Sequence, residues 1–253
     1  MFKSINPYSQ EVVAEFEPEE DPSGKVKAAH LAFKIWENTS ADHRKKQVLA
    51  FAGVLEKRKE EYARTITLEM GKLLPEAIAE VEKCIATARF YAEEAEDYLH
   101  RVTVRSSHSQ SWYAFEPLGV ILAIMPWNFP FWQVLRFALP NLLLGNTVIL
   151  KHASNVPGSA ANIESAFREA GFPPGLFQSL NLSSSRIETL ISDPLVRGVT
   201  LTGSGPAGAS VASLAGKYLK KSVLELGGSD PFVVLNDADL DAAAATAVKS
   251  RFQ

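Results

Sequence analysis

The segment that decides the fold is ILAIMPWNFP, from Ile121 to Pro130. Its first half is an apolar run, and its second half breaks that run with two prolines before an apolar helical pattern begins. This order predicts a buried parallel strand that ends in a short, rigid loop. Ligands bind at the carboxyl ends of the strands in an open α/β sheet, so the loop is a candidate binding segment.

Asn128 lies between the two prolines of this loop. Its side-chain amide could donate a hydrogen bond to a developing oxyanion without carrying a charge. It could equally cap the helix that follows, because asparagine is a preferred N-cap residue. The loop alone leaves both interpretations open.

Strand and helix patterns alternate downstream of this loop. Strands are predicted over 120–125, 147–151, 177–181, 198–202 and 222–226, and helices over 131–144, 158–170, 184–191 and 207–217. Strict alternation with short connections predicts an α/β fold with a parallel, doubly wound sheet of the Rossmann type. A nucleotide-like ligand would bind in this half of the chain.

The upstream part is predicted to be mainly helical. A hairpin over 2–18 would cover an edge of the sheet, and helices are expected over 25–37, 41–72 and 74–99. Residues 101–116 alternate polar and apolar side chains, which predicts a projecting β-ribbon. Its free edges would suit pairing with another subunit, and a hairpin packed on its own domain fits the pattern equally well.

Composition limits the functional classes. The chain has 253 residues, 46% of them hydrophobic, and a net charge of only -3, which argues against nucleic acid or an anionic membrane as partner. Its longest apolar stretch, 137–150, is too short and too interrupted to span a bilayer. No signal-peptide pattern opens the chain, and the single cysteine, Cys84, fits a reducing compartment and an inert packed thiol. We therefore expect a cytoplasmic protein.

The segment Gly203-Ser204-Gly205-Pro206-Ala207-Gly208 matches the G-x-G-x-x-G dinucleotide pattern. Helix N-terminal N–H groups and the Ser204 hydroxyl would hold the anionic oxygens of a pyrophosphate. The match is weak by itself, because the motif follows the fourth predicted strand and Pro206 lacks an N–H. A plain helix start remains the alternative.

Glu225 ends an apolar strand and precedes Gly227 and Gly228. The spacing rule of the dinucleotide pattern would make it a ribose ligand. Burial at a strand end raises the pKa of a carboxyl group and instead favours a general base. An ion-paired glutamate at the strand end is the structural alternative.

Four segments together resemble the NAD(P)-dependent aldehyde dehydrogenases. They are 126–130 (PWNFP), the strand end at Lys151, 201–204 (LTGS) and 224–228 (LELGG), and they occur in the order and at the spacing of that family. The stretches 151–157 (KHASNVP) and 225–232 (ELGGSDPF) look like the succinate-semialdehyde dehydrogenase branch. The resemblance covers essentially the whole chain.

This resemblance implies NAD(P)-dependent oxidation of a small aldehyde, succinate semialdehyde, to the carboxylic acid. Asn128 would belong to the oxyanion hole, Glu225 would be the general base and Arg136 would bind the substrate carboxylate, with a structural salt bridge as the alternative for Arg136. The implied cofactor-binding residues are Ile124, Pro126, Trp127, Lys151 at the adenosine ribose, Ser154, Gly203, Ser204 at the pyrophosphate, Leu226 and Gly227. The five histidines lack ligand spacing, so no metal is expected.

The cofactor could be NAD or NADP. NAD-restricted members of the family place a glutamate where this chain has Ser154, and a neutral serine would not repel a 2′-phosphate. We therefore expect dual or NADP-leaning use. The resemblance also implies a homo-oligomer, a dimer or a tetramer, in which the ribbon reaches a neighbouring subunit.

The resemblance implies three regions. Residues 1–100 and 117–229 would form the NAD(P)-binding domain, 101–116 the oligomerisation ribbon, and 230–253 the first strand (232–235) and helix (240–252) of a catalytic domain.

The cysteine nucleophile that the family requires would lie beyond Gln253. We therefore expect the chain to be truncated and the 253 residues alone to be inactive. The alternative is a genuine short protein that acts as a catalytically silent dinucleotide-binding or subunit-interaction module.

Overall fold

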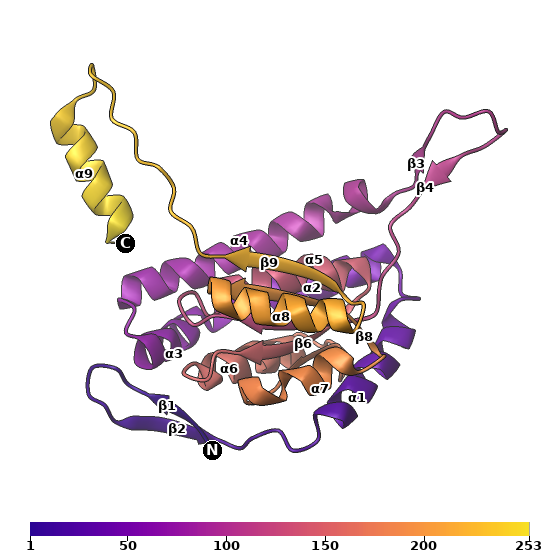
Figure 1. Ribbon diagram of the computed structural model, residues 1–253, viewed down its shortest axis with the longest axis horizontal. Coiled ribbons are helices and arrows are strands. Elements are labelled where there is room, and N and C mark those ends of the chain that lie inside the picture. The colour runs from indigo at the N-terminus through magenta and orange to yellow at the C-terminus, as the bar shows by residue number, and fades with distance from the viewer. Residues whose placement is uncertain (253) are drawn as a thin grey trace.

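The computed structural model describes residues 1–252 and has a five-stranded parallel sheet at its centre (Figure 1). The strand order is β7-β6-β5-β8-β9. Their bounds are β5 (Val120–Met125), β6 (Thr147–His152), β7 (Phe177–Ser179), β8 (Val196–Gly203) and β9 (Lys221–Leu226). The predicted parallel, doubly wound α/β fold is confirmed.

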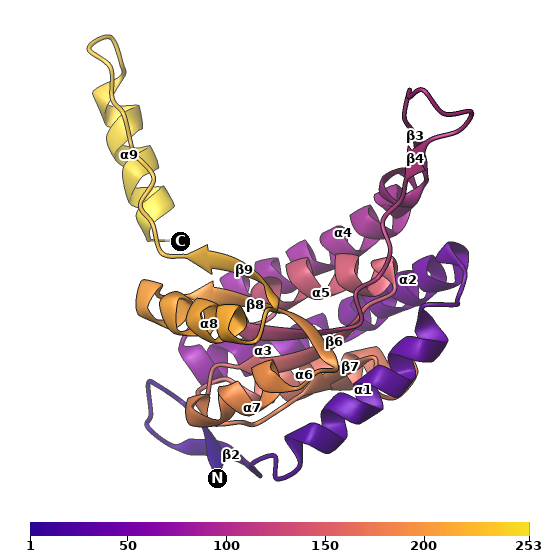
Figure 2. The same ribbon diagram turned by 45° about the vertical axis from the view of Figure 1, so that its right-hand side comes forward.

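Both faces of β5, β6, β7 and β8 are largely buried under helices, which explains why these strands are apolar on both sides, whereas the edge strand β9 is mostly exposed. Ala123 and Met125 of β5 belong to the core on one face, while Val120 and Leu122 belong to the core on the other. The first face is covered by α5 (Trp132–Leu144) and α6 (Pro157–Glu169). The second is covered by α1 (Pro22–Trp36), α7 (Ile187–Ser192), which follows the short 3-10 turn η1 (Ser184–Arg186), and α8 (Gly205–Lys217) (Figure 2).

A second helical layer packs on α5 and α6. It consists of α2 (Ala41–Lys57), α3 (Lys59–Met70) and α4 (Leu74–Leu99). The single helix predicted over 41–72 is wrong, because Arg58 has φ -105° and ψ 14° and separates α2 from α3. Gly71 then ends α3 in the left-handed conformation, φ 75°.

The N-terminal hairpin is formed by β1 (Phe2–Ile5) and β2 (Val12–Phe16). It lies against α3 and α6 rather than along an edge of the sheet, contrary to the prediction. Ser4 is buried there while most of β2 is exposed. The hairpin pairs with itself, so its position is set by packing on the helices and not by the sheet.

Two segments project from this body (Figure 1). The ribbon has strands of only two residues each, β3 (Val102–Thr103) and β4 (Trp112–Tyr113). The C-terminal tail extends away from β9 and ends in α9 (Leu240–Arg251), which buries none of its described residues. The strand expected over 232–235 is not formed, because these residues have no neighbouring strand among residues 1–252 to bond with.

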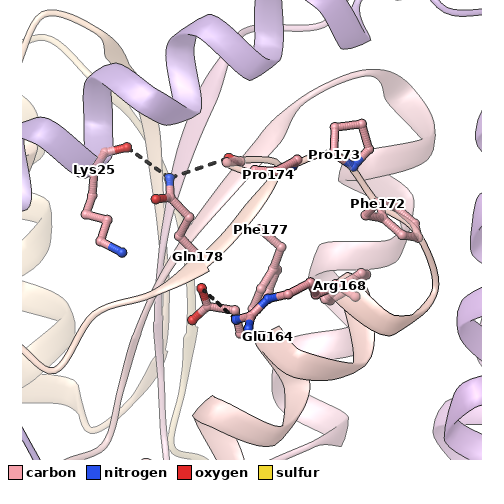
Figure 3. A pocket seen from close by; sticks show the side chains of 10 residues that line it. Lys25, Glu164, Arg168, Phe172, Pro173, Pro174, Phe177 and Gln178 are labelled. Carbon is pink, nitrogen blue, oxygen red and sulfur yellow. Dashed lines mark hydrogen bonds and ion pairs between the residues drawn. The ribbon is translucent and has the colours of Figure 1, made fainter.

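The β7 edge of the sheet is tied to α1 (Figure 3). The Gln178 amide donates to the Lys25 carbonyl at 2.9 Å and to the Gly175 carbonyl at 3.5 Å. Gly175 has φ 89°, and a Cβ added to it would lie 2.8 Å from the Ala28 carbonyl oxygen. Only glycine therefore allows α1 to approach this turn so closely.

Candidate functional site

The sheet opens a crevice between β5 and β8. The chain runs outward from β5 to β6 and β7, then returns to the other side of β5 with β8 and β9. Adjacent connections therefore leave in opposite directions at the carboxyl ends of β5 and β8, and this is the place where doubly wound sheets bind ligands. The loop 126–130 follows β5, and the glycine-rich segment 203–208 follows β8.

A cleft of about 430 Å³ lies at this point. It brings together most of the predicted site residues, from three separate strand ends and from α5. Its lining residues are Pro126, Trp127, Asn128, Gln133, Arg136, Thr202, Gly203, Glu225, Leu226 and Gly227. The roles assigned to these residues stay predictions, while their assembly in one cleft is a property of the fold.

The Asn128 side chain is free to act in this cleft. It is exposed, and it makes no hydrogen bond within the described residues. The helix-cap interpretation is wrong, since α5 begins after Phe131 without a side-chain cap. The amide is therefore available to donate to a ligand oxygen.

The loop that holds Asn128 is fixed by residues from other elements. Glu80 on α4 accepts hydrogen bonds from the Phe131 and Trp132 N–H groups at 2.9 and 3.0 Å. His152 at the end of β6 lies 2.9 Å from the Pro130 carbonyl oxygen through Nε2. These contacts place the loop from two sides.

Arg136 and Glu225 form an ion pair across the cleft. The distance from Arg136 Nη2 to Glu225 Oε2 is 3.4 Å, and the two side chains are 34% and 58% exposed. Arg136 thus has the partner that a guanidinium on an apolar helix needs. A guanidinium has five N–H donors, so this single contact leaves others for an anionic ligand.

Glu225 is not buried as predicted. Its strand, β9, is at the edge of the sheet, and five of its six residues are exposed. The burial that supported a general base at Glu225 is therefore not present in this structure. What favours a role in the site is its position in the lining of the same cleft as Asn128 and in contact with Arg136.

Ile124 and Lys151 are direct neighbours on β5 and β6. Lys151 is half-buried, and burial lowers the pKa of its ammonium group. Ser154 is exposed in the turn before α6. None of these three residues lines the cleft of about 430 Å³: Ile124 is on β5, Lys151 is near the end of β6, and Ser154 is in the turn between β6 and α6.

The helix N-termini at this edge of the sheet differ in their partners. The first N–H groups of α5 are bound by Glu80. Those of α6, from Gly158 and Ser159, are bound by the buried Glu69 at 2.6 and 2.7 Å, and desolvation raises the pKa of this carboxyl despite the hydrogen bonds. Each carboxylate fills the place where an anionic ligand would bind.

The N-terminus of α8 has no such carboxylate among the described residues. Its cap is Ser204, whose hydroxyl accepts from the Ala207 N–H at 3.4 Å. Gly205 has open space around it, and a Cβ on Gly208 would lie 2.5 Å from the Leu226 side chain. Gly205 therefore leaves the backbone open to a ligand, and Gly208 allows α8 to pack closely on β9.

Sequence reasoning missed two residues of the cleft, Gln133 and Thr202. Gln133 lies one helical turn before Arg136, so its place on the same face could have been inferred from the spacing. Its Oε1 atom is buried without a hydrogen-bond partner among the described residues. Thr202 adjoins Gly203, but alternation along a strand does not tell which face meets a cleft.

Within residues 1–252, no three His, Cys, Asp or Glu side chains lie close enough to hold a metal ion. None of the helices described is both long and apolar enough to cross a membrane. Cys84 is buried, and burial raises its thiol pKa well above the usual value, as expected for an inert thiol.

Known proteins are similar to this chain over nearly its whole length. The model of the aldehyde dehydrogenase family matches residues 1–253. A Synechocystis sp. protein named probable succinate-semialdehyde dehydrogenase (NADP+) is 49% identical over 252 residues, and succinate-semialdehyde dehydrogenase (NADP+) 1 of Mycobacterium bovis is 46% identical over 255. Both alignments cover 99% of this chain but 56% of the relative, so the chain spans about half the length of these relatives.

A solved structure is also similar. It is succinic semialdehyde dehydrogenase from Streptococcus pyogenes in complex with NADP+, which aligns with a TM-score of 0.92 and 40% identity. The alignment covers 95% of this chain and 54% of that chain.

Proposed function

The chain belongs to the aldehyde dehydrogenase family, and we propose that it is the cofactor-binding part of an enzyme that oxidises succinate semialdehyde to succinate with NADP. The observation that supports this most directly is the cleft at the sheet's crevice, where Asn128, Arg136 and Glu225 lie together. It offers a neutral donor, a cation and a carboxylate within one site. These groups suit a substrate with an aldehyde at one end and a carboxylate at the other.

In this proposal Arg136 binds the substrate carboxylate with the N–H donors that Glu225 leaves free. Asn128 donates to the aldehyde oxygen and stabilises the negative charge that develops there. Glu225 accepts a proton from the water that hydrolyses the acyl product. Its exposed edge-strand position gives it access to that water.

The residues at the α8 N-terminus fit a dinucleotide. Its N–H groups and the Ser204 hydroxyl would hold the pyrophosphate, since Glu80 and Glu69 already occupy the N-termini of α5 and α6. Lys151 would contact the adenosine ribose, and Ser154 would leave room for a 2′-phosphate. When bound, the nicotinamide supplies the hydride acceptor. NADP in the names of the similar proteins supports the same assignment.

We propose the domain division expected from the sequence: 1–100 and 117–229 for cofactor binding, 101–116 for oligomerisation and 230–253 as the start of a further domain. The extended tail and the exposed α9 support the last of these (Figure 2). The family nucleophile, a cysteine, would come from residues beyond Gln253. Residues 1–253 alone are therefore proposed to bind the cofactor without turning over substrate.

Two proteins test this function: the 253-residue chain, and the chain joined to the remaining C-terminal part of the Synechocystis relative. In calorimetric titrations, NADP should bind to both proteins. When succinate semialdehyde and NADP are added, absorbance at the NADPH band should rise only with the joined protein. Saturable turnover by the 253 residues would disprove the role of an external cysteine. A joined protein that binds NADP but oxidises no aldehyde would disprove the proposed function.

We also propose a cytoplasmic homo-oligomer in which the ribbon pairs with a second copy. Trp112, Tyr113 and Phe115 on the ribbon are each at least half exposed, at 52%, 50% and 60%. Such large apolar side chains on a projecting hairpin suit an interface. Light scattering should give a dimer or tetramer for the joined protein and a monomer when Trp112, Tyr113 and Phe115 are all replaced by serine.

A further inference from the structure

The loop 126–130 is placed by contacts from outside its own segment. No N–H of Trp127, Asn128 or Phe129 donates to a backbone carbonyl among the described residues. The loop is also on the surface, with Trp127, Asn128 and Phe129 exposed. Prolines at both ends stiffen it but do not fix its distance from the rest of the cleft.

Lys72 and Glu80 form a buried ion pair directly behind this loop. Their side chains are only 8% and 1% exposed, and Lys72 Nζ contacts Glu80 Oε2. Lys72 follows α3 and Glu80 is on α4, so the pair belongs to the outer helical layer. A buried ion pair contributes little to stability compared with apolar side chains of the same size. We therefore ask what the Lys72–Glu80 pair holds in place.

Lys72 contacts the loop 126–130, and Glu80 contacts the two residues that directly follow it. The Lys72 ammonium lies 3.7 Å from the centre of the Phe129 ring, next to Asn128. Glu80 Oε1 binds the Phe131 and Trp132 N–H groups, three and four residues after Asn128. One ion pair thus holds the loop on both sides of Pro130 through a cation–π contact and two charge-assisted hydrogen bonds.

We propose that Lys72 and Glu80 are positioning residues that set the place of the Asn128 amide in the cleft. This inference rests on the proposed function for its catalytic consequence. Neither residue lines the cleft. They act through Phe129 and through the first N–H groups of α5. Loss of the pair allows the loop to shift, and a shift of about 1 Å in a catalytic group costs up to about a hundredfold in rate.

The test compares Lys72→Met with Lys59→Met in the joined protein. Lys59 pairs with Glu82 at 2.6 Å and also links α3 to α4, but this pair is on the surface, at 31% and 53% exposure. Lys72→Met should lower kcat by about tenfold or more and change the NADP Kd by less than about threefold. Lys72→Arg, which keeps the charge, should recover most of kcat.

Equal kcat values in Lys72→Met and Lys59→Met would overturn the inference. So would a parallel loss of kcat, NADP affinity and thermal stability, since that describes a general structural role. If Lys72→Met does not fold, Glu80→Gln replaces it, because the amide oxygen can still accept from Phe131 and Trp132 while the charge pair is lost.

A second measurement does not depend on activity. Hydrogen exchange of the Phe131 and Trp132 amides in the 253-residue chain should be about tenfold faster in Lys72→Met than in Lys59→Met. Exchange at the same rate in both variants would overturn the inference even if the joined wild-type protein proves inactive. Inactivity of that protein, with faster exchange in Lys72→Met, would disprove the proposed function and leave the loop contact standing.

Discussion

His152 should make the stability of this fold sensitive to mild acid. Its ring is buried at the end of β6, where Ala153 N–H donates to Nδ1 at 2.9 Å. This contact and the shorter distance from Nε2 to the Pro130 carbonyl oxygen, 2.9 Å against 3.2 Å from Nδ1 to the Met125 carbonyl oxygen, assign the proton of the neutral ring to Nε2. Protonation of Nδ1 would remove the acceptor of the Ala153 N–H, and the only hydrogen bond it would gain among the described residues is the 3.2 Å contact with the Met125 carbonyl. It would also place a charge on a group that is almost fully buried.

Burial lowers the pKa of His152 from 6.5 to about 4, against the opposing effect of the Pro130 and Met125 carbonyls. Between these values the unfolded chain binds a proton that the folded chain does not, so the free energy of unfolding falls as the pH falls. Above pH 6.5, where His152 is neutral in both the folded and the unfolded chain, the free energy of unfolding has its full value with respect to this group. About 2 kcal/mol is lost by pH 5, and about 3 kcal/mol once the pH is below 4.

Urea unfolding at pH 7.5, 6.5, 5.5 and 5.0 measures this loss. For each protein, the loss is the free energy of unfolding at pH 7.5 minus its value at the lower pH. At pH 5 this loss should be about 2 kcal/mol smaller in His152→Gln than in the wild type. His108→Gln, at an exposed position on the ribbon, should follow the wild type. The same pH dependence in wild type and His152→Gln would refute the reasoning, because carboxylates elsewhere would then account for it.

Three further predictions concern single positions. Gly175→Ala should lower the free energy of unfolding by about 1 to 3 kcal/mol, because Gly175 has a positive φ and the new Cβ would clash with the Ala28 carbonyl. Gly53→Ala, at an exposed position within α2, should raise it by about 0.5 to 1 kcal/mol, and urea unfolding measures both changes. Ser154→Glu should weaken NADP by about tenfold or more and leave NAD within about threefold in calorimetric titrations; NAD binding about a hundredfold tighter than NADP to the wild type would contradict the argument. Arg136→Ala in the joined protein should raise the KM for succinate semialdehyde by about tenfold or more and spare an uncharged aldehyde of similar length, and equal loss for both substrates would leave Arg136 only as the partner of Glu225.

The sequence predicted which residues form the candidate site better than it predicted how buried those residues are. Asn128, Arg136 and Glu225 were expected on separate segments, and the sheet places all of them on one cleft. The burial of Glu225 was wrong because an apolar strand pattern does not tell a central strand from an edge strand. The single helix over 41–72 was wrong for a related reason, since a change of φ and ψ at Arg58 leaves the apolar spacing almost unchanged.

The sequence by itself determined the order of strands and helices and the segments that end at the crevice. Those features depend on local periodicity and on proline and glycine, which act on neighbouring residues. Only the tertiary structure decided which charged groups meet: Arg136 with Glu225, Lys72 with Glu80, and Glu69 with the N-terminus of α6. Periodicity indicates that a side chain is buried, but it does not identify the residue with which that side chain pairs. Partners far apart in the chain are set by the packing of one layer on another, because a buried charge is stable only where that packing supplies its counterpart.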